Sequence, residues 1–265
     1  MSDISNFEFK KKFGQNFLKD NNVLNNIVEK SEIEEDTLVI EIGVGAGYLT
    51  KYIASKAKYV VGFEIDESLN AIIYNNLKDF NNVEIVYEDF LKANVTEILK
   101  KYDYKHVYVI ANLPYYITTP IIEKIIDLNI AERLVVMVQK EVGDRFNAKM
   151  GTKDYNSLTL YLNYYFKISK IMDVSRNSFI PKPNVDSAVI RFDRYYRNDA
   201  KSENKLFALI RDSFQFKRKN LRNNLKNYNL ESIEKTLKKY GKDLTVRAEN
   251  ISLEEFIDIS NNLEG

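Results

Sequence analysis

The chain has 265 residues, of which 45% are hydrophobic, with a formal net charge of +1, one histidine and no cysteine. The length suits one large domain or two smaller ones, and the absence of cysteine excludes disulfides and thiolate metal sites. The single histidine, His106, argues against histidine-based acid–base or zinc chemistry. No apolar run approaches the roughly 18 residues of a membrane span, and Met1–Ser5 lacks a signal-peptide pattern. We therefore expect a cytoplasmic protein without membrane contacts. We also expect a monomer, although the composition does not bear on the oligomeric state.

Short apolar segments alternate with helical patterns over the first two-thirds of the chain. Five segments are predicted to be buried parallel strands, because they are short, apolar and rich in β-branched residues: Leu38–Ile42, Tyr59–Ile65, Val83–Tyr87, His106–Ala111 and Arg133–Gln139. Helical patterns lie between them, at Tyr48–Ala57, Glu67–Leu77 and Thr119–Leu128. This alternation predicts an α/β fold with a doubly wound, Rossmann-like sheet.

The pattern changes in the last third. Leu160–Met172 and Val185–Tyr195 are predicted to be two further strands, an antiparallel pair at one sheet edge. The segments that follow have helical spacing, with Gly241 as a helix C-cap: Lys205–Phe214, Lys217–Leu225, Glu231–Tyr240 and Leu253–Leu263. We predict a catalytic domain over residues 1–197, including an N-terminal arm over 1–20, and a small all-helical domain over 198–265.

Positive charge is concentrated in the predicted helical domain. Between Lys205 and Lys242 there are eleven Lys and Arg residues against three Asp and Glu residues, and Lys10–Lys12 form a second basic cluster. Such segregation favours a polyanionic partner such as nucleic acid, although a solvated helix face gives the same pattern.

A glycine-rich loop, Glu41–Tyr48, joins the first predicted strand to the first helix. Its glycines permit a tight turn and a close approach of a ligand to the backbone, but dinucleotide and flavin enzymes use similar loops. Glu64, at the end of the second strand, suits the two hydroxyls of a ribose. Asp89, after the third strand, suits an adenine amino group. Together the three features favour S-adenosylmethionine over a dinucleotide.

The fourth predicted strand ends in Asn112-Leu113-Pro114-Tyr115. Pro114 restricts both itself and Leu113 to non-helical backbone, so the segment is predicted to be a rigid turn. An Asn oxygen and a backbone carbonyl can both accept from one amino group, and a Tyr ring can lie on the face of a base. An ordinary strand-to-helix turn is the alternative for this tetrapeptide alone.

These motifs are similar to those of a known family. The chain resembles the ribosomal RNA adenine N6,N6-dimethyltransferases, most closely the bacterial branch that modifies small-subunit (16S) rRNA. The likeness runs nearly end to end. Besides the glycine loop, the two acidic positions and the Asn112 turn, it includes Lys12–Leu18, Gln139–Val142, Phe179–Ala188 and Arg247–Ser252.

The resemblance implies that S-adenosylmethionine is the donor and that two adjacent adenines, in a hairpin loop near the 3′ end of the rRNA, are the acceptors. It also implies a role in small-subunit biogenesis. The implied cofactor-binding residues are Gln15, Asn16, Leu18, Gly43, Gly45, Glu64, Ile65, Asp89, Phe90 and Asn112. The implied catalytic turn is Asn112, Leu113, Pro114 and Tyr115, and no metal is implied. Phe179 would face Tyr115 across the target base, and Lys217, Arg218, Lys219 and Arg222 would bind the RNA.

We expect catalysis by positioning rather than by a strong base. The Asn112 side-chain oxygen and the Pro114 carbonyl would accept the two hydrogens of the adenine amine, and the proton would leave to water. The flipped base would stack between Tyr115 and Phe179. One departure from the family pattern is Asn156, which follows Tyr155 where we expect Gly, and this weakens the implied RNA contact of that loop.

Three other functions stay open at this point. A large-subunit (23S) rRNA adenine methyltransferase of the antibiotic-resistance type is a close relative, although Val185–Ala188 and Arg247–Ser252 favour the small-subunit branch. A ribosome-assembly factor without useful catalysis would use the same RNA contacts. A nicotinamide dehydrogenase would share the glycine loop, but nothing in the sequence resembles a hydride-transfer site.

Overall fold

The computed structural model describes residues 16–114 and 117–263. Contacts divide the chain into two compact units, Met1–Gly143 with Ser169–Arg194, and Asp144–Ile168 with Tyr195–Gly265. The predicted domain boundary after residue 197 lies close to Arg194–Tyr195, where the chain passes from the first unit to the second. Residues 144–168, however, group with the C-terminal residues and not with the predicted catalytic domain. Among the described residues, no helix is both long and apolar enough to cross a membrane.

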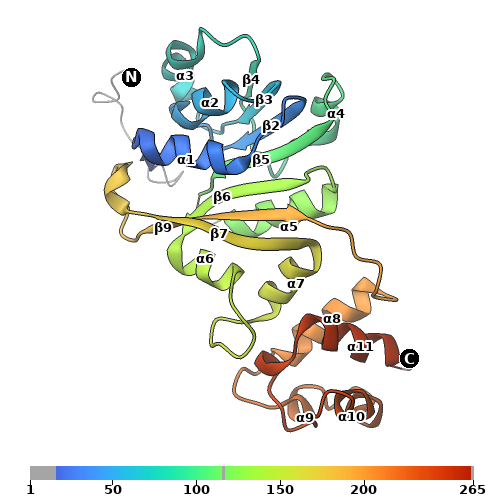
Figure 1. Cartoon of the computed structure of the whole chain (residues 1–265). Helices are drawn as coiled ribbons and strands as arrows, with labels where there is room; N and C mark the ends of the chain where they lie inside the picture. Colours follow the sequence, from blue (N-terminus) through green and yellow to red (C-terminus); the bar gives the residue numbers. More distant parts are fainter. Residues whose placement is uncertain (1–15, 115–116, 264–265) are drawn as a thin grey trace. The chain divides into compact units, whose positions relative to one another are not determined.

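A seven-stranded sheet forms the centre of the first unit (Figure 1), with strand order β4-β3-β2-β5-β6-β9-β7. Strands β2 to β6 run parallel along this order, and β9 is antiparallel to β6. The strands are β2 (Thr37–Ile42), β3 (Tyr59–Phe63), β4 (Val83–Val86), β5 (His106–Asn112), β6 (Arg133–Gln139), β7 (Phe166–Val174) and β9 (Ser187–Arg194). The five predicted parallel strands and the doubly wound topology are confirmed.

The register of the central strands brings distant residues to one edge of the sheet. Ile42 of β2 pairs with Phe63 of β3 on one side and with Ala111 of β5 on the other. The residues that follow, Gly43, Glu64 and Asn112, therefore emerge together at the carboxyl ends of the strands. Strand order reverses between β2 and β5, and such a switch point is where open α/β sheets bind ligands.

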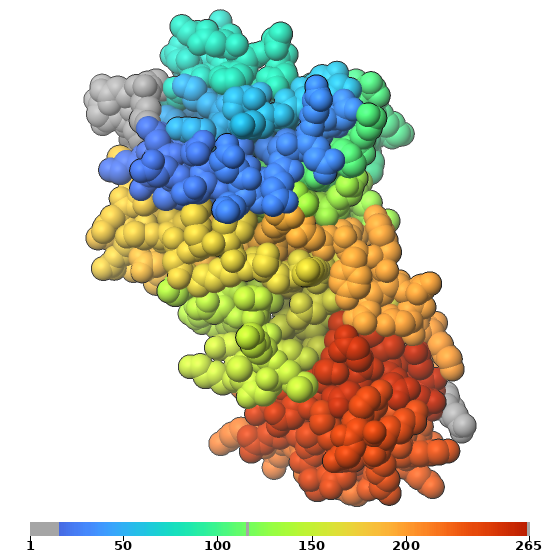
Figure 2. All heavy atoms as spheres, viewed as in Figure 1, coloured from blue at the N-terminus to red at the C-terminus, as the bar shows by residue number. Residues whose placement is uncertain are grey.

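Helices α1 (Asn21–Ser31), α2 (Tyr48–Ala54) and α3 (Asn70–Leu77) cover one face of this sheet. Their apolar residues pack with alternate strand residues, such as Val39, Tyr108 and Met137, in a single core. Figure 2 shows the dark blue atoms of α1 on the surface of the viewed side. The other helices of this part of the chain are α4 (Val95–Leu99), α5 (Thr118–Leu128) and α6 (Lys140–Phe146). Helix α1 was not anticipated from its Asn-rich sequence.

A separate two-stranded sheet connects the chain before α1 to the segment before β9. Strand β1 (Phe17–Leu18) pairs antiparallel with β8 (Phe179–Ile180). Nearby, the Lys19 N–H donates to the Ser178 carbonyl at 2.9 Å, and the Ser178 hydroxyl donates to Asp20 at 3.2 Å. Asp20 also caps the first turn of α1. These contacts fix the entry into α1 next to the strand ends.

The second unit has its own apolar core, built from helices α7 (Ser157–Tyr165), α8 (Glu203–Ser213), α9 (Leu221–Asn224), α10 (Leu230–Lys238) and α11 (Leu253–Asn262). The strand predicted over Leu160–Met172 is wrong in its first half, because Asn156 forms a capping box that starts α7. Leu160 and Tyr164, one helical turn apart, both enter this core, which explains why residues 144–168 belong to the second unit. The helix predicted over Lys217–Leu225 is shorter, since Asn220 caps it only at Leu221.

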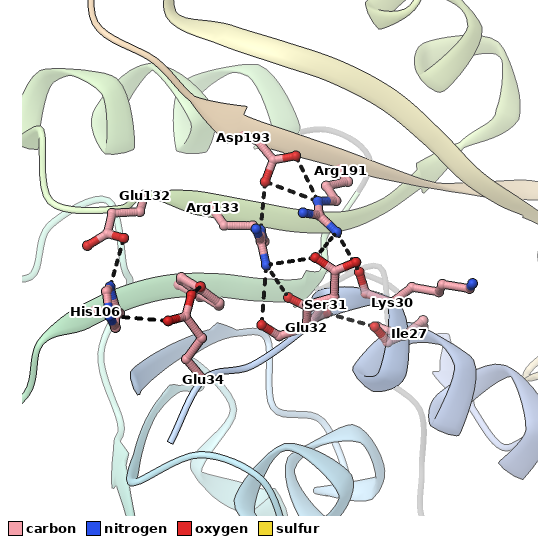
Figure 3. A network of polar contacts seen from close by, with 11 residues as sticks. Ile27, Lys30, Ser31, Glu32, Glu34, His106, Glu132, Arg133, Arg191 and Asp193 are labelled. Atoms are coloured by element: carbon pink, nitrogen blue, oxygen red, sulfur yellow. Dashed lines mark hydrogen bonds and ion pairs between the residues drawn. The ribbon is translucent and has the colours of Figure 1, made fainter. Parts of the chain in front are cut away.

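Charged residues join the end of α1 to β6 and β9 (Figure 3). Arg133 and Arg191 both bind the Asp193 carboxylate, at 2.6 and 2.8 Å. The same two side chains donate to the last carbonyls of α1, at Ser31 and Lys30, and Arg191 pairs with Glu32 at 2.8 Å. Cations at a helix C-terminus stabilise its unpaired carbonyls. The network holds α1 at the end opposite to the strand pair β1–β8.

His106 lies between two carboxylates at the start of β5 (Figure 3), with Nδ1 at 2.9 Å from Glu132 and Nε2 at 3.4 Å from Glu34. The hydrogen bond with Glu132 raises the pKa of His106 above its ordinary value of 6.5. The protonated ring therefore contributes stability that is complete below the unfolded-state pKa and is lost as the pH rises through the higher folded-state pKa.

We expect His106→Gln to destabilise the protein at pH 5.5 by about 1 kcal/mol or less, because water screens a pair this close to the surface. The difference from wild type should shrink as the pH is raised to 8.5. Urea unfolding of both proteins at the two pH values measures it. A difference that is the same at pH 5.5 and 8.5 would contradict a role for the charged ring.

Candidate functional site

A pocket opens at the carboxyl ends of β2, β3 and β5, where the register brings Gly43, Glu64 and Asn112 together. It lies within the first unit and includes residues from the chain before α1 and from the start of α5. Its lining residues are Asn16, Phe17, Ile42, Gly43, Gly45, Phe63, Glu64, Ile65, Glu88, Asp89, Phe90, Leu91, Asn112, Leu113, Pro114, Ile117 and Ile121. Eight of the ten predicted cofactor-binding residues are among them.

The glycine loop turns sharply above β2, and its N–H groups are already in use. Gly43 and Gly45 have φ values of 79° and 58°, a left-handed backbone that suits glycine. The N–H groups of Gly43 and Val44 donate to the Phe63 carbonyl, and that of Gly45 donates to Glu64 Oε2 at 2.8 Å. The loop therefore does not present these groups to a phosphate, in contrast to the loops that bind dinucleotides.

Glu64 is the buried acidic group of the pocket and is only 7% exposed. Its Oε2 accepts from Gly45, and its Oε1 accepts from the N–H groups of Ile65 and Asp66 at 2.8 and 2.9 Å. Burial raises the pKa of Glu64, and these three donors oppose the rise. A carboxylate has about four acceptor positions. Three are filled, so one remains for a hydroxyl of a ligand.

The segment after β4 forms the other acidic wall of the pocket. Asp89 is partly exposed, and its Oδ1 accepts from the Leu91 N–H at 3.0 Å. Phe90 is buried and meets Phe63 edge to face at 5.3 Å between ring centroids. Ile65 is 51% exposed and offers an apolar surface beside Glu64. A carboxylate with apolar neighbours suits the amino group and the flat face of a purine.

Lys124 of α5 holds the backbone of the segment that follows Asp89. The sequence did not indicate this contact. Its ammonium donates to three backbone carbonyls, those of Phe90, Leu91 and Ala93, at 2.7, 3.0 and 2.8 Å. Burial lowers the pKa of Lys124, while the negative charges of Asp89 and Glu88 oppose that effect. All three ammonium donors have acceptors, so the conformation of residues 90–93 depends on this side chain.

Asn112 ends β5 with its amide held in one orientation. Its Nδ2 donates to the Asn16 carbonyl at 3.1 Å, which leaves Oδ1 as the acceptor of this side chain. The Pro114 carbonyl accepts from the Ile117 N–H at 3.2 Å and from the Thr118 hydroxyl at 3.4 Å. Both lone pairs of that oxygen thus have donors, which conflicts with its predicted use for the substrate amine. No hydrogen bond to the Leu113 carbonyl is found in the described part of the chain.

The remaining predicted pocket residues are placed differently. Gln15 and Tyr115 lie outside the described residues. Leu18 and Phe179 face each other across the β1–β8 pair, are 5% and 3% exposed, and belong to the core rather than to the pocket lining. Phe17 lines the pocket instead, and a Cβ at Gly45 would come within 3.1 Å of its ring. Phe17 was not predicted as a pocket residue. Gly45 was the available clue, because a glycine leaves room for a large side chain to pack against the loop.

The four predicted RNA-binding cations all lie in the second unit. Lys217, Arg218 and Lys219 follow α8, Arg222 lies in α9, and all four are exposed. Lys217 and Lys219 line a hollow of this unit together with Arg145 and Lys153, and with two acidic residues, Asp154 and Glu249. Lys217 also donates to the Lys153 carbonyl at 2.7 Å. The prediction that these residues form a basic surface therefore agrees with their placement.

The charge of the pocket indicates the class of its ligand. Glu64, Glu88 and Asp89 line it, and its described lining residues include no Lys, Arg or His. An acidic pocket disfavours the pyrophosphate of a dinucleotide and suits a cation. In the described part of the chain, no group of three or more His, Cys, Asp or Glu residues has an arrangement that could hold a metal ion.

Comparisons with known proteins agree with this geometry. A family model described as "Ribosomal RNA adenine dimethylase" matches residues 6–264. The chain is 44% identical to the ribosomal RNA small subunit methyltransferase A of Clostridium acetobutylicum, over 97% of this chain and 95% of that protein. It is 46% identical to the protein of the same name from Bacillus cytotoxicus, over 97% and 92% of the two chains.

Two solved structures are similar over most of their length. A dimethyladenosine transferase from Plasmodium falciparum has a TM-score of 0.77 at 25% identity, covering 92% of this chain and 95% of that one. The 23S rRNA methyltransferase ErmE has a TM-score of 0.76, also at 25% identity, covering 94% and 100%.

Proposed function

The chain belongs to the ribosomal RNA adenine dimethylase family, and we propose that it dimethylates the N6 amines of two adjacent adenines near the 3′ end of small-subunit (16S) rRNA. It is an S-adenosylmethionine-dependent enzyme of rRNA methylation. The observation that carries the proposal is the Asn112 amide, which is fixed by the Asn16 carbonyl beside an acidic pocket. A role in small-subunit biogenesis accompanies this activity in our proposal.

The lining residues of the pocket fit S-adenosylmethionine in charge and in hydrogen-bonding and apolar character. The ligand carries a sulfonium in addition to the ammonium and the carboxylate of its amino-acid end, so its net charge is positive, and the lining offers Glu64, Glu88 and Asp89. We assign the ribose to the free acceptor position of Glu64 and the adenine to Asp89, with Ile65 and Phe90 against the ring. Gly43, Gly45 and Asn16 would lie along the remainder of the ligand. When bound, it supplies a methyl group on an electrophilic sulfur.

The protein positions the adenine amine for attack. This nitrogen is a poor nucleophile because its lone pair is delocalised into the ring. The Asn112 Oδ1 would accept one of its hydrogens, and the Leu113 carbonyl, in place of the occupied Pro114 carbonyl, would accept the other. Two acceptors on one amine favour a pyramidal nitrogen with its lone pair directed at the methyl group. Neither is a strong base, so the proton leaves to water.

Dimethylation sets one further requirement. After the first transfer the amine keeps a single hydrogen, so one of the two acceptors is left without its partner. Both are neutral groups at the edge of a partly exposed pocket, where water can replace the lost contact. A charged acceptor that lost its hydrogen-bond donor in the second step would raise the free energy of the complex more than a neutral acceptor does.

The small-subunit branch is favoured over the large-subunit alternative. The relatives named small subunit methyltransferase A are 44–46% identical to this chain, whereas the 23S enzyme ErmE is 25% identical. Incubation with undermethylated small subunits and labelled S-adenosylmethionine, followed by mapping of the label, tests the proposal. We expect label on two neighbouring adenines of 16S rRNA. In a parallel incubation with large subunits, label on 23S rRNA, with none on 16S rRNA in the first incubation, would refute it.

A non-catalytic assembly role is separable by a substitution in the pocket. Cells carrying Glu64→Ala should accumulate unmethylated 16S rRNA if catalysis is the main function. Cells that lack the protein are the comparison. Normal ribosome profiles both in these cells and with Glu64→Ala would place the contribution in methylation alone. Profiles that are normal with Glu64→Ala but abnormal without the protein would show an assembly role that does not need catalysis.

Lys124 gives a prediction that is specific to this pocket. Lys124→Met keeps an unbranched side chain that is one atom shorter, but removes the three hydrogen bonds to residues 90–93. We expect the KM for S-adenosylmethionine to rise about tenfold, a cost of about 1.4 kcal/mol, with kcat at saturation changed much less. Lys92→Met, at an exposed position of the same segment, is the matched control. Equal effects of the two variants would contradict the positioning role.

A further inference from the structure

The turn between α8 and α9 presents an aromatic ring to solvent. Phe216 is 56% exposed, although phenylalanine is among the residues most often buried. Two residues earlier, Phe214 turns inward and meets Tyr155 and Phe256, each at 6.3 Å between ring centroids. Phe214 therefore attaches the turn to the core of the second unit, and Phe216 is not needed to hold the turn in place. No ring contact of Phe216 occurs among the described residues.

The backbone of Phe216 is fixed. Its N–H donates to the Asn224 side-chain oxygen at 3.3 Å, and the Asn224 amide donates to the carbonyls of Phe216 and Ser213, at 3.4 and 2.6 Å. Asn224 is 9% exposed, and the Lys219 N–H also donates to the Phe216 carbonyl at 2.8 Å. Because its backbone is already held by hydrogen bonds, the exposed ring loses little conformational entropy when a partner binds it.

The surroundings of Phe216 are strongly basic. Lys217, Arg218 and Lys219 follow it directly, and residues 213–230 contain five Lys and Arg residues and no Asp or Glu. The hollow beside Lys217 and Lys219 also contains Asp154 and Glu249, but the three residues that directly follow the ring are all cations. An exposed apolar ring followed by three cations suits a partner with flat apolar faces and negative charge between them. Unpaired nucleotides have both, because bases stack on aromatic side chains while phosphates pair with Lys and Arg. An apolar protein surface would not use the charge.

We propose that Phe216 stacks on an unpaired base of the rRNA, with the adjacent phosphates on Lys217, Arg218 and Lys219. The inference rests on the proposed function, since it presumes rRNA as the partner. Phenylalanine has no polar side-chain atom, so it cannot form hydrogen bonds with the edge of a base. The contact should therefore accept any of the four bases. It adds affinity for unpaired RNA at a distinct place from the pocket of the first unit.

Binding of undermethylated small subunits by the full chain tests the proposal. Phe216→Ala should weaken binding about 5-fold to 100-fold, the range that one lost base–ring stack gives. Phe216→Tyr keeps the ring and should bind within about twofold of wild type. Because no charge changes, the dependence of affinity on salt should keep its slope. A Phe216→Ala variant with wild-type affinity overturns the inference, as does a Phe216→Tyr variant as weak as Phe216→Ala.

The absence of tryptophan from the chain allows a direct readout. Phe216→Trp introduces the only indole, and stacking on a base should quench its fluorescence when undermethylated small subunits are added. Tyr74→Trp, at a 68% exposed position of α3, is the control and should change little. Equal responses of the two variants, or no response of Phe216→Trp at saturation, would overturn the inference. A loss of affinity for subunits but not for protein-free 16S rRNA would assign Phe216 to a ribosomal protein and also overturn it.

The outcome separates this inference from the function itself. If the unmodified chain neither binds nor methylates small subunits, the proposed function fails. If it does both and the Phe216 variants behave as wild type, only the stacking contact fails.

Discussion

Asn112→Ala should lower kcat for methyl transfer by a factor of about 10² to 10³ or more, with the fold intact. The substitution removes the side-chain oxygen that would hold the adenine amine, and a single lost group of a preorganised site has effects of this size. It also removes the donor to the Asn16 carbonyl, 3.1 Å away, so the affinity for S-adenosylmethionine should fall to a smaller degree. Single-turnover methylation of small subunits measures the first effect and calorimetric titration the second.

Two further variants separate the roles of this side chain. Asn112→Asp keeps an acceptor oxygen but loses the hydrogen bond to Asn16 and gains a charge, so we expect partial activity above that of Asn112→Ala. Asn81→Ala removes an exposed amide from the loop before β4 and serves as the control for a general loss of stability. Wild-type turnover by Asn112→Ala would refute the mechanism, because no other described side chain of this turn offers a neutral acceptor.

Parts of this site could be predicted because parallel strands impose their own geometry. The runs Leu38–Ile42 and His106–Ala111 are apolar and β-branched, and a buried parallel strand is the structure that such a run favours. Once these strands are placed, the residues at their carboxyl ends must share one edge. Gly43, Glu64 and Asn112 were therefore predicted to meet, and they do.

Other features depend on contacts that a local pattern does not contain. The alternating run Leu160–Leu162–Tyr164 resembles a strand, but the capping box of Asn156 and the core of the second unit make it helical. The Pro114 carbonyl, which the sequence suggested for the amine, already has donors for a similar reason. Pro114 lies just before α5, so its carbonyl accepts from the first turn of that helix. Helix starts decide which backbone groups remain free, and their positions are uncertain by a few residues from sequence alone.

The change of Lys217, Arg218 and Lys219 together to Gln should weaken binding to small subunits at 0.15 M salt by about 10-fold to 1000-fold. Each lost phosphate contact reduces the slope of log affinity against log salt by about 0.7 to 0.9. Three contacts would give a change of about 2 to 3, but Lys217 also donates to the Lys153 carbonyl. A change nearer 2 is therefore expected. Affinity for S-adenosylmethionine should not alter, since that pocket lies within the first unit.

A second triple variant distinguishes the turn from the total charge. Lys226, Lys235 and Lys238 are exposed in the same unit, and their change to Gln removes the same three charges. If the long-range field of the protein brings the RNA in, both triple variants should bind equally poorly. If phosphates contact the turn after α8, only the variant at residues 217–219 should show a smaller slope of log affinity against log salt. An unchanged slope in that variant would mean that the RNA lies elsewhere, and the stacking assigned to Phe216 would then have no neighbouring phosphates to support it.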